Sequence, residues 1–584
     1  MNKWLTMVLL TMCLGLARAQ ITDWETYYEK SNFLETPRYD KTIEYCEQLA
    51  DHSDFIEYTS FGKSVQGRDL PLLIIDRNRN FTPQAIKESG NAVLMIEACI
   101  HPGESEGKDA GFMLLRDILI HNKYPELLEN TSILFIPIFN ADGHERFSAY
   151  NRINQNGPKE MGWRTTAENY NLNRDFTKAD APEMQQWLTL FNQWLPDMFV
   201  DIHTTDGADY QYAITYGMHV MGDMNPEQTD WQNQYLGKIE EQLKKDDILM
   251  FPYVSFRRWH DPRSGLIRQT SSPRYSTGYL ASQNRPALLV ETHMLKDYKT
   301  RVDATYQLLK HTIAYTDTHY QTLKGMNRKA DNESENMAGK EFVLSYYTSQ
   351  KDSTTVLFKG VEYDIVHSDL TDGIWVQFSD KPKDYNLVLF DSLMPGKKAL
   401  LPNAYIIPVQ WYHVINKLKL HGIQYITLNE PKEIAAKTYK FSDIKFAGFP
   451  FEGRQMVEDF EMEEVAMLKT YMPGSVIVPL NQRTGKIIAH LLEPEGPDSF
   501  LRWGFFNSIF ERKEYVETYI MEKMAREMIK ENPDLLKEYK QALEEHPEVY
   551  NNQWAKVFWF LERSAYRDQQ KNIYPVGKIY NSEF

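Results

Sequence analysis

A histidine and a glutamate three positions apart are the residues of this sequence best suited to chemistry. His101 and Glu104 follow the apolar run Val93–Ile100, and Pro102-Gly103 separate them. The run predicts a buried strand, and Pro102-Gly103 predict a turn at its carboxyl end. An imidazole nitrogen and a carboxylate oxygen at such a turn could bind one Zn²⁺, which would then need a third protein ligand and a water. The same spacing also occurs by chance as a turn with two solvated side chains, so the pair needs partners.

Two later strand ends carry residues that could complete the site. Asp197–Ile202 predicts a strand that places His203 at its carboxyl end. Arg285–His293 predicts a further apolar strand, with Glu291 near its end and with Glu291 and His293 on one face. Open α/β sheets bind ligands outside the carboxyl ends of their strands, so we expect these residues on the same rim. The alternatives are a structural histidine and a buried ion pair.

A long, asparagine-rich loop at Tyr150–Asn171 is too long to be idle in a compact domain. It contains Trp163-Arg164 and leads into Asn173-Arg174. Loop arginines often form surface ion pairs, and a guanidinium can also bind a carboxylate through two parallel hydrogen bonds. The position of these arginines, beside the candidate metal ligands, leaves both interpretations open.

The chain around these residues alternates strands with helices, which predicts an α/β fold of helices layered on a sheet. Predicted strands cover Asp69–Ile75, Ala92–Ile100, Ser132–Phe139, Asp197–Ile202 and Arg285–His293. Predicted helices cover Tyr39–Leu49, Gly107–Asn122 and Ala181–Trp194.

The composition is that of an ordinary globular protein with more than one domain. Of 584 residues, 42% are hydrophobic and 25% are charged, and a chain of this length is expected to form two or three domains. The formal net charge of −16 argues against nucleic acid or anionic lipid as a partner, because their phosphates would be repelled. After the N-terminal segment, no run approaches the ~18 apolar residues of a membrane span.

The N-terminal segment has the pattern of a secretory signal peptide. A charged start and the apolar run Trp4–Leu16 precede Ala17-Arg18-Ala19, so we expect residues 1–19 to be removed and the protein to be secreted or periplasmic. Cys46 and Cys99 then remain. They could form one disulfide, whereas a zinc site of four cysteines is excluded.

Together these residues resemble the zinc carboxypeptidases of the carboxypeptidase A type, the M14 metallopeptidases, over roughly residues 60–310. The resemblance implies a mixed-sheet α/β/α catalytic domain, one Zn²⁺ per chain and a peptide substrate with a free C-terminal carboxylate. It assigns roles to these residues: zinc ligands His101, Glu104 and His203, general base Glu291, Arg164 at the scissile carbonyl, and Asn173 and Arg174 at the terminal carboxylate.

The sequence departs from the family pattern at several positions. Gly103 stands between two zinc ligands where the digestive enzymes have an arginine, so one substrate-side arginine is absent. The mobile tyrosine that closes over the substrate has two candidates, Tyr275 and Tyr279, with Tyr275 the expected substrate contact. His293 is a further candidate contact, or a second base beside Glu291. The side-chain specificity and the physiological substrate stay open.

The residue types suit peptide-bond hydrolysis. Zn²⁺ held by two imidazoles and a carboxylate keeps one position open and lowers the pKa of a bound water towards ~7. Glu291 could take that proton and pass it to the leaving amine. Arg164 could stabilise the oxyanion, and Arg174 could hold a carboxylate. We therefore predict a zinc metallocarboxypeptidase.

The region after the predicted catalytic domain has a different character. Arg328–Lys340 is polar and aperiodic and predicts a linker between a catalytic domain at 20–327 and a C-terminal α+β region at 341–584. This region contains a predicted helix over Glu511–Ala542 and no recognisable catalytic constellation. A stabilising or substrate-access role is expected, with glycan or partner binding as the alternative.

Two other functions are consistent with parts of the pattern. A zinc amidase or deacylase on the same scaffold would act on murein peptides or acyl-amino acids, but Arg164 and Asn173-Arg174 favour a free carboxylate beside the cleaved bond. A non-catalytic binding protein would have lost ligands or base, whereas the full set is present. The sequence leaves the oligomeric state open.

Overall fold

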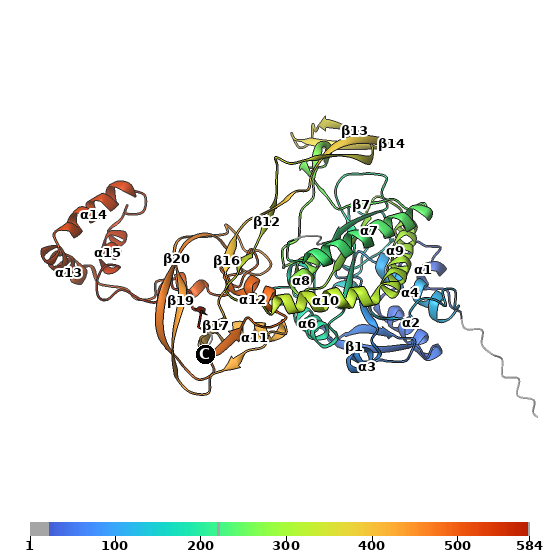
Figure 1. Cartoon of the computed structure of the whole chain (residues 1–584). Coiled ribbons are helices and arrows are strands. Elements are labelled where there is room, and N and C mark those ends of the chain that lie inside the picture. Colours follow the sequence, from blue (N-terminus) through green and yellow to red (C-terminus); the bar gives the residue numbers. More distant parts are fainter. Residues whose placement is uncertain (1–22, 219–221, 582–584) are drawn as a thin grey trace, which may run out of the picture.

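The computed structural model describes residues 23–218 and 222–581 (Figure 1). The predicted signal peptide lies outside these ranges. Within them, a mixed eight-stranded sheet of order β1-β2-β4-β3-β5-β10-β6-β7 forms the centre of the catalytic part. Its strands are β1 (Ile56–Lys63), β2 (Asp69–Ile75), β3 (Ala92–Glu97), β4 (Thr131–Ile136), β5 (Met198–Thr205), β6 (Ile214–Met218), β7 (Met250–Pro252) and β10 (Ala287–His293).

The predicted α/β fold with a mixed sheet is confirmed. β3 runs parallel to both β4 and β5, and β5 runs parallel to β10. The pairs β1–β2, β2–β4 and β6–β10 are antiparallel. The predicted strand Asp69–Ile75 coincides with β2, whereas β5 continues to Thr205, so His203 lies within the strand rather than after it.

Helices cover both faces of this sheet, which is why its central strands are continuous apolar runs. One face packs on α4, α7, α9 and α10, and the other packs on α6 and α8 (Figure 1). Leu94 and Met95, successive residues of β3, belong to the two different cores. The helices of this part are α1 (Tyr27–Lys30), α2 (Tyr39–His52), α3 (Pro83–Ser89), α4 (Glu106–Leu119), α5 (Ala141–Glu145), the 3₁₀ turn η1 (Leu172–Arg174), α6 (Pro182–Trp194), α7 (Pro226–Lys245), α8 (Ser276–Ser282), α9 (Tyr298–Thr318) and α10 (Tyr320–Ser334).

The prediction that Arg328–Lys340 is an irregular linker is wrong for its first half. α10 continues to Ser334, and both Ala330 and Ser334 are fully buried. Asp331 forms an ion pair of 2.9 Å with Arg285 of the catalytic part. The polar residues between Ala330 and Ser334 form the exposed face of an amphipathic helix. Because they are numerous, they hide the apolar periodicity of the helix in the sequence. The domain boundary in this segment stays a prediction.

The C-terminal region contains strands and helices, as the predicted α+β content requires. A hairpin of β13 (Thr354–His367) and β14 (Ile374–Phe390) extends β8 (Ser255–Arg258) and β9 (Asp261–Ile267) into a four-stranded sheet that projects from the catalytic part (Figure 1). Two short pairs, β11 (Glu341–Val343) with β16 (Lys398–Leu400) and β12 (Tyr346–Thr348) with β15 (Leu393–Pro395), follow α10.

A six-stranded sheet of order β18-β21-β17-β22-β19-β20 forms the centre of the C-terminal region. Its strands are β17 (Ala404–Ile407), β18 (Ile426–Thr427), β19 (Lys432–Phe446), β20 (Val457–Tyr471), β21 (Val476–Pro479) and β22 (Gly577–Ile579). The accompanying helices are η2 (Val409–Trp411), α11 (Tyr412–Leu420), α12 (Gly485–Leu492) and η3 (Asn507–Phe510).

The segment predicted as one helix over Glu511–Ala542 contains two helices, α13 (Thr518–Glu531) and α14 (Asp534–Glu545). A third helix, α15 (Gln553–Leu561), follows them in the chain. These three helices share a small core of their own and lie apart from the six-stranded sheet in Figure 1.

The catalytic part and the C-terminal region share one hydrophobic core on the α6 side of the central sheet. Phe176 and Trp187 belong to the same buried cluster as Leu418, Phe500 and Trp503 of the C-terminal region. The second region therefore covers apolar surface that the catalytic part would otherwise leave open.

Cys46 and Cys99 are both buried and free, so the disulfide that the sequence allowed is not formed. In the described parts of the chain, none of the helices combines the length and the hydropathy that a membrane crossing requires.

Candidate active site

The three predicted zinc ligands meet at the carboxyl ends of β3 and β5. The ligand atoms of His101, Glu104 and His203 lie within 4.8 Å of one another, and all three side chains are buried. His203 Nδ1 is 3.1 Å from His101 Nδ1 and 2.9 Å from Glu104 Oε2. Two imidazoles and one carboxylate, with a position left for water, are a donor set that fits Zn²⁺.

The backbone after β3 explains this convergence. Cys99 adopts a left-handed conformation with φ of 59°, which turns the chain at the end of the strand. The turn through Pro102-Gly103 then brings Glu104 N to 2.9 Å from His101 O. His101 and Glu104 therefore lie on one turn, next to the end of the parallel strand β5.

Two further side chains fix the orientation of the histidines. His101 Nε2 is 3.0 Å from Asn171 Oδ1, and His203 Nε2 is 3.0 Å from Asp201 Oδ2. A partner at Nε2 favours the tautomer whose Nδ1 can bind a metal. Sequence reasoning missed both partners. Asp201 could have been found, because it lies two positions before His203 on the same face of a strand, whereas Asn171 in its irregular loop offered no such signal.

The charges within the triad also suit metal binding. Burial lowers the pKa of His101 to about 4, so this imidazole is neutral at pH 7. Burial acts to raise the pKa of Glu104, but Arg152 and His101 outweigh it and hold that pKa well below its usual value. Burial acts to lower the pKa of His203, but Asp201 and Glu104 outweigh it and raise that pKa well above its usual value. A metal ion would take the place of the His203 proton at Nδ1.

Glu291 lies beside the triad, because β10 runs next to β5 with Glu291 in register with His203. Burial raises the pKa of Glu291 to about 8, His203 acts against this shift, and neighbouring carboxylates such as Glu104 add to it. A carboxyl group whose pKa lies near neutrality can accept a proton in one step and donate it in the next.

One cleft of about 770 Å³ contains most of the predicted site residues. Those that line it are His101, Glu104, Arg164, Asn173, Arg174, His203, Tyr275 and Glu291. Arg164 Nη1 is 3.7 Å from Glu104 Oε1, so Arg164 borders the triad. The Tyr275 ring stacks on Arg174, with 4.5 Å between the ring centre and the guanidinium carbon. The cleft thus contains both the triad and the stacked pair of Arg174 and Tyr275.

His293 and Tyr279 do not line this cleft, which corrects two predictions. His293 is fully buried, because the loop after β5 packs against it, and its Nε2 is 2.9 Å from Asp209 Oδ1. Tyr279 is fully buried in α8, and its hydroxyl is 3.0 Å from His421 Nδ1. Of the two candidate tyrosines, the structure therefore places only Tyr275 in the cleft.

Arg152 lines the cleft and was missed by sequence reasoning. Its Nη2 is 2.7 Å from Glu104 Oε1. Its stem fills the space beside Gly103, where an added Cβ would lie 2.6 Å from Arg152 Cγ. The space beside Gly103 is therefore filled by an arginine from the polar loop. That loop contains several polar residues of similar character, so its sequence did not single out Arg152.

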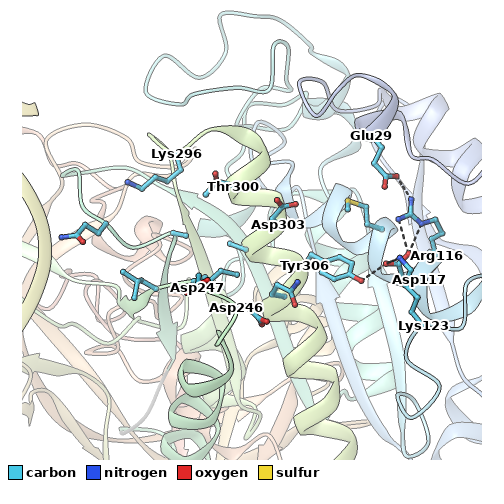
Figure 2. Close-up of a pocket in the computed structure, with 17 residues that line it drawn as sticks. Glu29, Arg116, Asp117, Lys123, Asp246, Asp247, Lys296, Thr300, Asp303 and Tyr306 are labelled. Carbon is cyan, nitrogen blue, oxygen red and sulfur yellow. Dashed lines mark hydrogen bonds and ion pairs between the residues drawn. The ribbon is translucent and has the colours of Figure 1, made fainter. Parts of the chain in front are cut away.

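A second cavity, of about 730 Å³, lies beside α4 and α9 (Figure 2). Several of its side chains pair with one another: Arg116 with Glu29, and both Lys123 and Tyr306 with Asp117. Among the described residues, the triad of His101, Glu104 and His203 is the only group of His, Cys, Asp and Glu side chains placed so that it could hold a metal. The cleft at the strand ends is therefore the candidate active site.

A mixed α/β sheet whose strand ends carry two histidines and a glutamate, a donor set suited to Zn²⁺, is an arrangement that zinc-dependent hydrolases can use. The sequence model of the zinc carboxypeptidases, the M14 peptidases, matches residues 42–355, which is more than half of the chain. The chain therefore belongs to the zinc carboxypeptidase family, and by class it is a zinc metallocarboxypeptidase, a peptide hydrolase.

Similar proteins include two fungal carboxypeptidases. "Carboxypeptidase 2" of Trichophyton rubrum is 23% identical over 494 residues, covering 80% of this chain and 84% of that protein. "Carboxypeptidase 2" of Trichophyton equinum is 21% identical over 492 residues, with 80% and 84% covered. Coverage of that extent necessarily includes part of the C-terminal region.

Solved structures also match. A metallo-carboxypeptidase from Burkholderia cenocepacia is 17% identical with a TM-score of 0.36, covering 48% of this chain and 69% of that one. A metallo-carboxypeptidase from Pseudomonas aeruginosa, in complex with (2-guanidinoethylmercapto)succinic acid, is 15% identical with a TM-score of 0.37, covering 49% and 69%.

Proposed function

We propose that the protein removes the C-terminal residue of peptides that end in a free carboxylate. One observation carries this proposal: Arg174 lines the cleft that contains the triad and has no carboxylate partner there. Its Nη1 donates to Asn173 O (2.8 Å) and its guanidinium stacks on Tyr275, while no carboxylate of the described residues forms an ion pair with it. A partly buried guanidinium in this state is suited to bind a carboxylate from a ligand.

The residues around the triad carry the proposed chemistry. Zn²⁺ bound by the two histidines and Glu104 would supply a Lewis acid and a water of lowered pKa. Glu291 accepts a proton from the attacking water as the water oxygen bonds to the scissile carbonyl carbon. The carbon–nitrogen bond then breaks, and Glu291 delivers the proton to the leaving amine. Arg164, beside Glu104, donates to the carbonyl oxygen as it becomes negative.

The remaining cleft residues carry the proposed substrate binding. Asn173 and Arg174 hold the terminal carboxylate, and Arg174 can do so with two parallel hydrogen bonds. Tyr275 packs on the guanidinium and limits its orientations.

A double cycle between Arg174 and the substrate carboxylate tests this function. Peptides with a free and with an amidated C terminus are compared on wild-type protein and on Arg174→Ala. Either change alone leaves one charged partner unmatched and should cost of order 2–5 kcal/mol in kcat/KM. Because both changes remove the same interaction, the two losses should not add.

The cycle is valid only if Arg174→Ala still holds zinc, which the metal content of the purified variant shows. Fully additive losses, or amidated peptides that are cut as well as free ones, would contradict the proposal. They would favour a zinc amidase or deacylase that acts on murein peptides or acyl-amino acids.

We also propose that the chain is exported and that its mature form begins at Gln20. The support is the charged start, the apolar run and Ala17-Arg18-Ala19 at the N terminus. N-terminal sequencing of the exported protein checks this, and a mature chain that begins at Met1 would contradict it.

A further inference from the structure

The C-terminal region contacts the loop segment that carries Asn173 and Arg174. Asn171 N donates to Glu452 Oε2 at 3.1 Å, and Glu452 lies in the turn between β19 and β20. The backbone of Glu452 has a positive φ of 48°, which residues other than glycine rarely adopt. The turn therefore holds Glu452 in this conformation at a cost in free energy. The same Asn171 places its side chain beside His101. One residue of the loop is thus held from the C-terminal region and contacts the zinc-ligand triad.

Other side chains of the C-terminal region hold the continuation of this segment. Arg454 donates twice to Asp180, at 2.7 Å each. Trp503 Nε1 donates to Thr177 Oγ1 at 3.0 Å, and His421 Nε2 lies 3.0 Å from Thr177 O. The segment from Asn171 to Asp180 has one 3₁₀ turn and the internal contacts of Asp175 with Lys178 and Asp180 N, and the contacts from the C-terminal region add to these.

A second contact holds the segment that carries Tyr275. Asp498 is fully buried and accepts from Arg274 N at 2.7 Å, and its carboxylate also forms an ion pair with the Arg274 side chain. The Arg274 guanidinium lies 4.7 Å from the ring centre of Trp503. The next residue, Tyr275, stacks on Arg174. The two segments therefore meet in the cleft at Arg174 and are both anchored outside it by the C-terminal region.

We infer that Glu452 and Asp498 are positioning residues for the site that binds the substrate's terminal carboxylate, so the C-terminal region is part of the substrate-binding apparatus. This inference rests on the proposed function of Arg174. A guanidinium binds a carboxylate through two hydrogen bonds only when both groups are aligned, and a small displacement of the loop removes that alignment. Burial lowers the pKa of Arg174, and Tyr275 and the Glu452 carboxylate act against this shift.

Variants of these two residues, assayed with free and amidated peptides, test the inference. We expect Glu452→Ala and Asp498→Ala to raise KM for the free peptide and to lower its kcat/KM by about tenfold or more, with a smaller change in kcat. Activity on the amidated peptide should not change, because it lacks the group that the positioned guanidinium binds. Glu452→Gln keeps an acceptor for Asn171 N and should stay within about twofold of wild type.

Matched controls use acidic residues of the same hairpin that face solvent. Glu463→Ala and Asp459→Ala each remove an exposed carboxylate of β20 that pairs with a lysine of β19, and both should behave as wild type. Because Asp498 is buried, Asp498→Asn is included as a variant that keeps the shape of the side chain. Zinc content is measured for every variant.

The two substrates separate the possible outcomes. A loss confined to the free peptide, with zinc retained, supports the inference. Equal losses on both peptides, or loss of zinc, would show a general structural role and overturn it. If Glu452→Ala and both Asp498 variants keep the wild-type ratio of kcat/KM between the free and the amidated peptide, this inference fails, while the proposed function of Arg174 stands. If wild-type protein cuts both peptides equally well, the proposed function fails and this inference fails with it.

Discussion

At the scale of single residues, each histidine of the triad depends on a partner outside the triad. We expect purified protein to hold about one zinc per chain, and His101→Ala or His203→Ala to lose it. Asp201→Ala should weaken zinc binding by roughly 10–100-fold, because it removes the group that orients the ring of His203. Metal content after dialysis measures both effects. Full occupancy in the two histidine variants would contradict the ligand assignment.

Glu291 is the residue whose chemistry can be separated from its structure most cleanly. Glu291→Gln has nearly the same shape but cannot accept a proton. It should therefore keep zinc and fold, while kcat falls by about 10²-fold or more. Steady-state kinetics beside metal analysis and thermal unfolding check this. A near-normal kcat would mean that another group accepts the proton. His293 is no longer the nearest candidate for that role, because it is enclosed beside Asp209.

At the scale of elements, Gly103 and Arg152 belong to two loops that share one space. Arg152→Ala should lower kcat/KM by about tenfold, about 1.4 kcal/mol, because it removes a guanidinium from the cleft. Gly103→Ala should cause a similar loss, since its Cβ would displace the Arg152 stem. In the protein that carries both Gly103→Ala and Arg152→Ala, the Arg152 stem no longer occupies the space beside position 103. The two losses in kcat/KM should therefore not add. The kcat/KM values of the four proteins measure the coupling, and independent losses would show that Arg152 does not act through this position.

The elements differ in how much of them the sequence reveals, for physical reasons. β2, β3 and β5 were predicted because strands covered on both faces are continuous apolar runs with clear ends. The end of α10 was missed because an exposed helix face with many polar residues resembles a linker in sequence. Of the site, the triad and Glu291 follow strands and could be located, whereas Arg152 comes from an irregular loop, where sequence position does not determine where a side chain points.

At the scale of the whole molecule, the contacts between the catalytic part and the C-terminal region could not have been predicted from local pattern. Glu452 and Asn171 are 281 positions apart, and a hydrogen bond of this kind leaves no periodicity in the sequence. The shared core is equally hidden, since Trp187 and Trp503 each look like ordinary core residues of separate domains. The sequence showed that its composition and pattern change near residue 340. It did not show that the catalytic part depends on the C-terminal region.

That dependence leads to a prediction about chain length. A chain that ends at residue 340 should be insoluble or aggregate, because it exposes the face of α6 that packs on α11 and on Phe500 and Trp503. Size-exclusion chromatography and binding of a hydrophobic dye, each compared with the full chain, measure this. A soluble, cooperatively folded fragment would show that the catalytic part completes its own core.

The matched control removes a different part of the C-terminal region. The helices α13–α15 have their own small core, and the chain enters and leaves them side by side, since Asn572 N donates to Ile509 O at 2.9 Å. Deleting residues 513–570 and joining the ends with a short glycine-rich loop therefore leaves β22 and the shared core in place. We expect this protein to remain soluble, to bind zinc and to keep kcat/KM within about twofold of the full chain. Loss of activity with the fold intact would mean that these helices affect catalysis in a way that does not depend on the shared core.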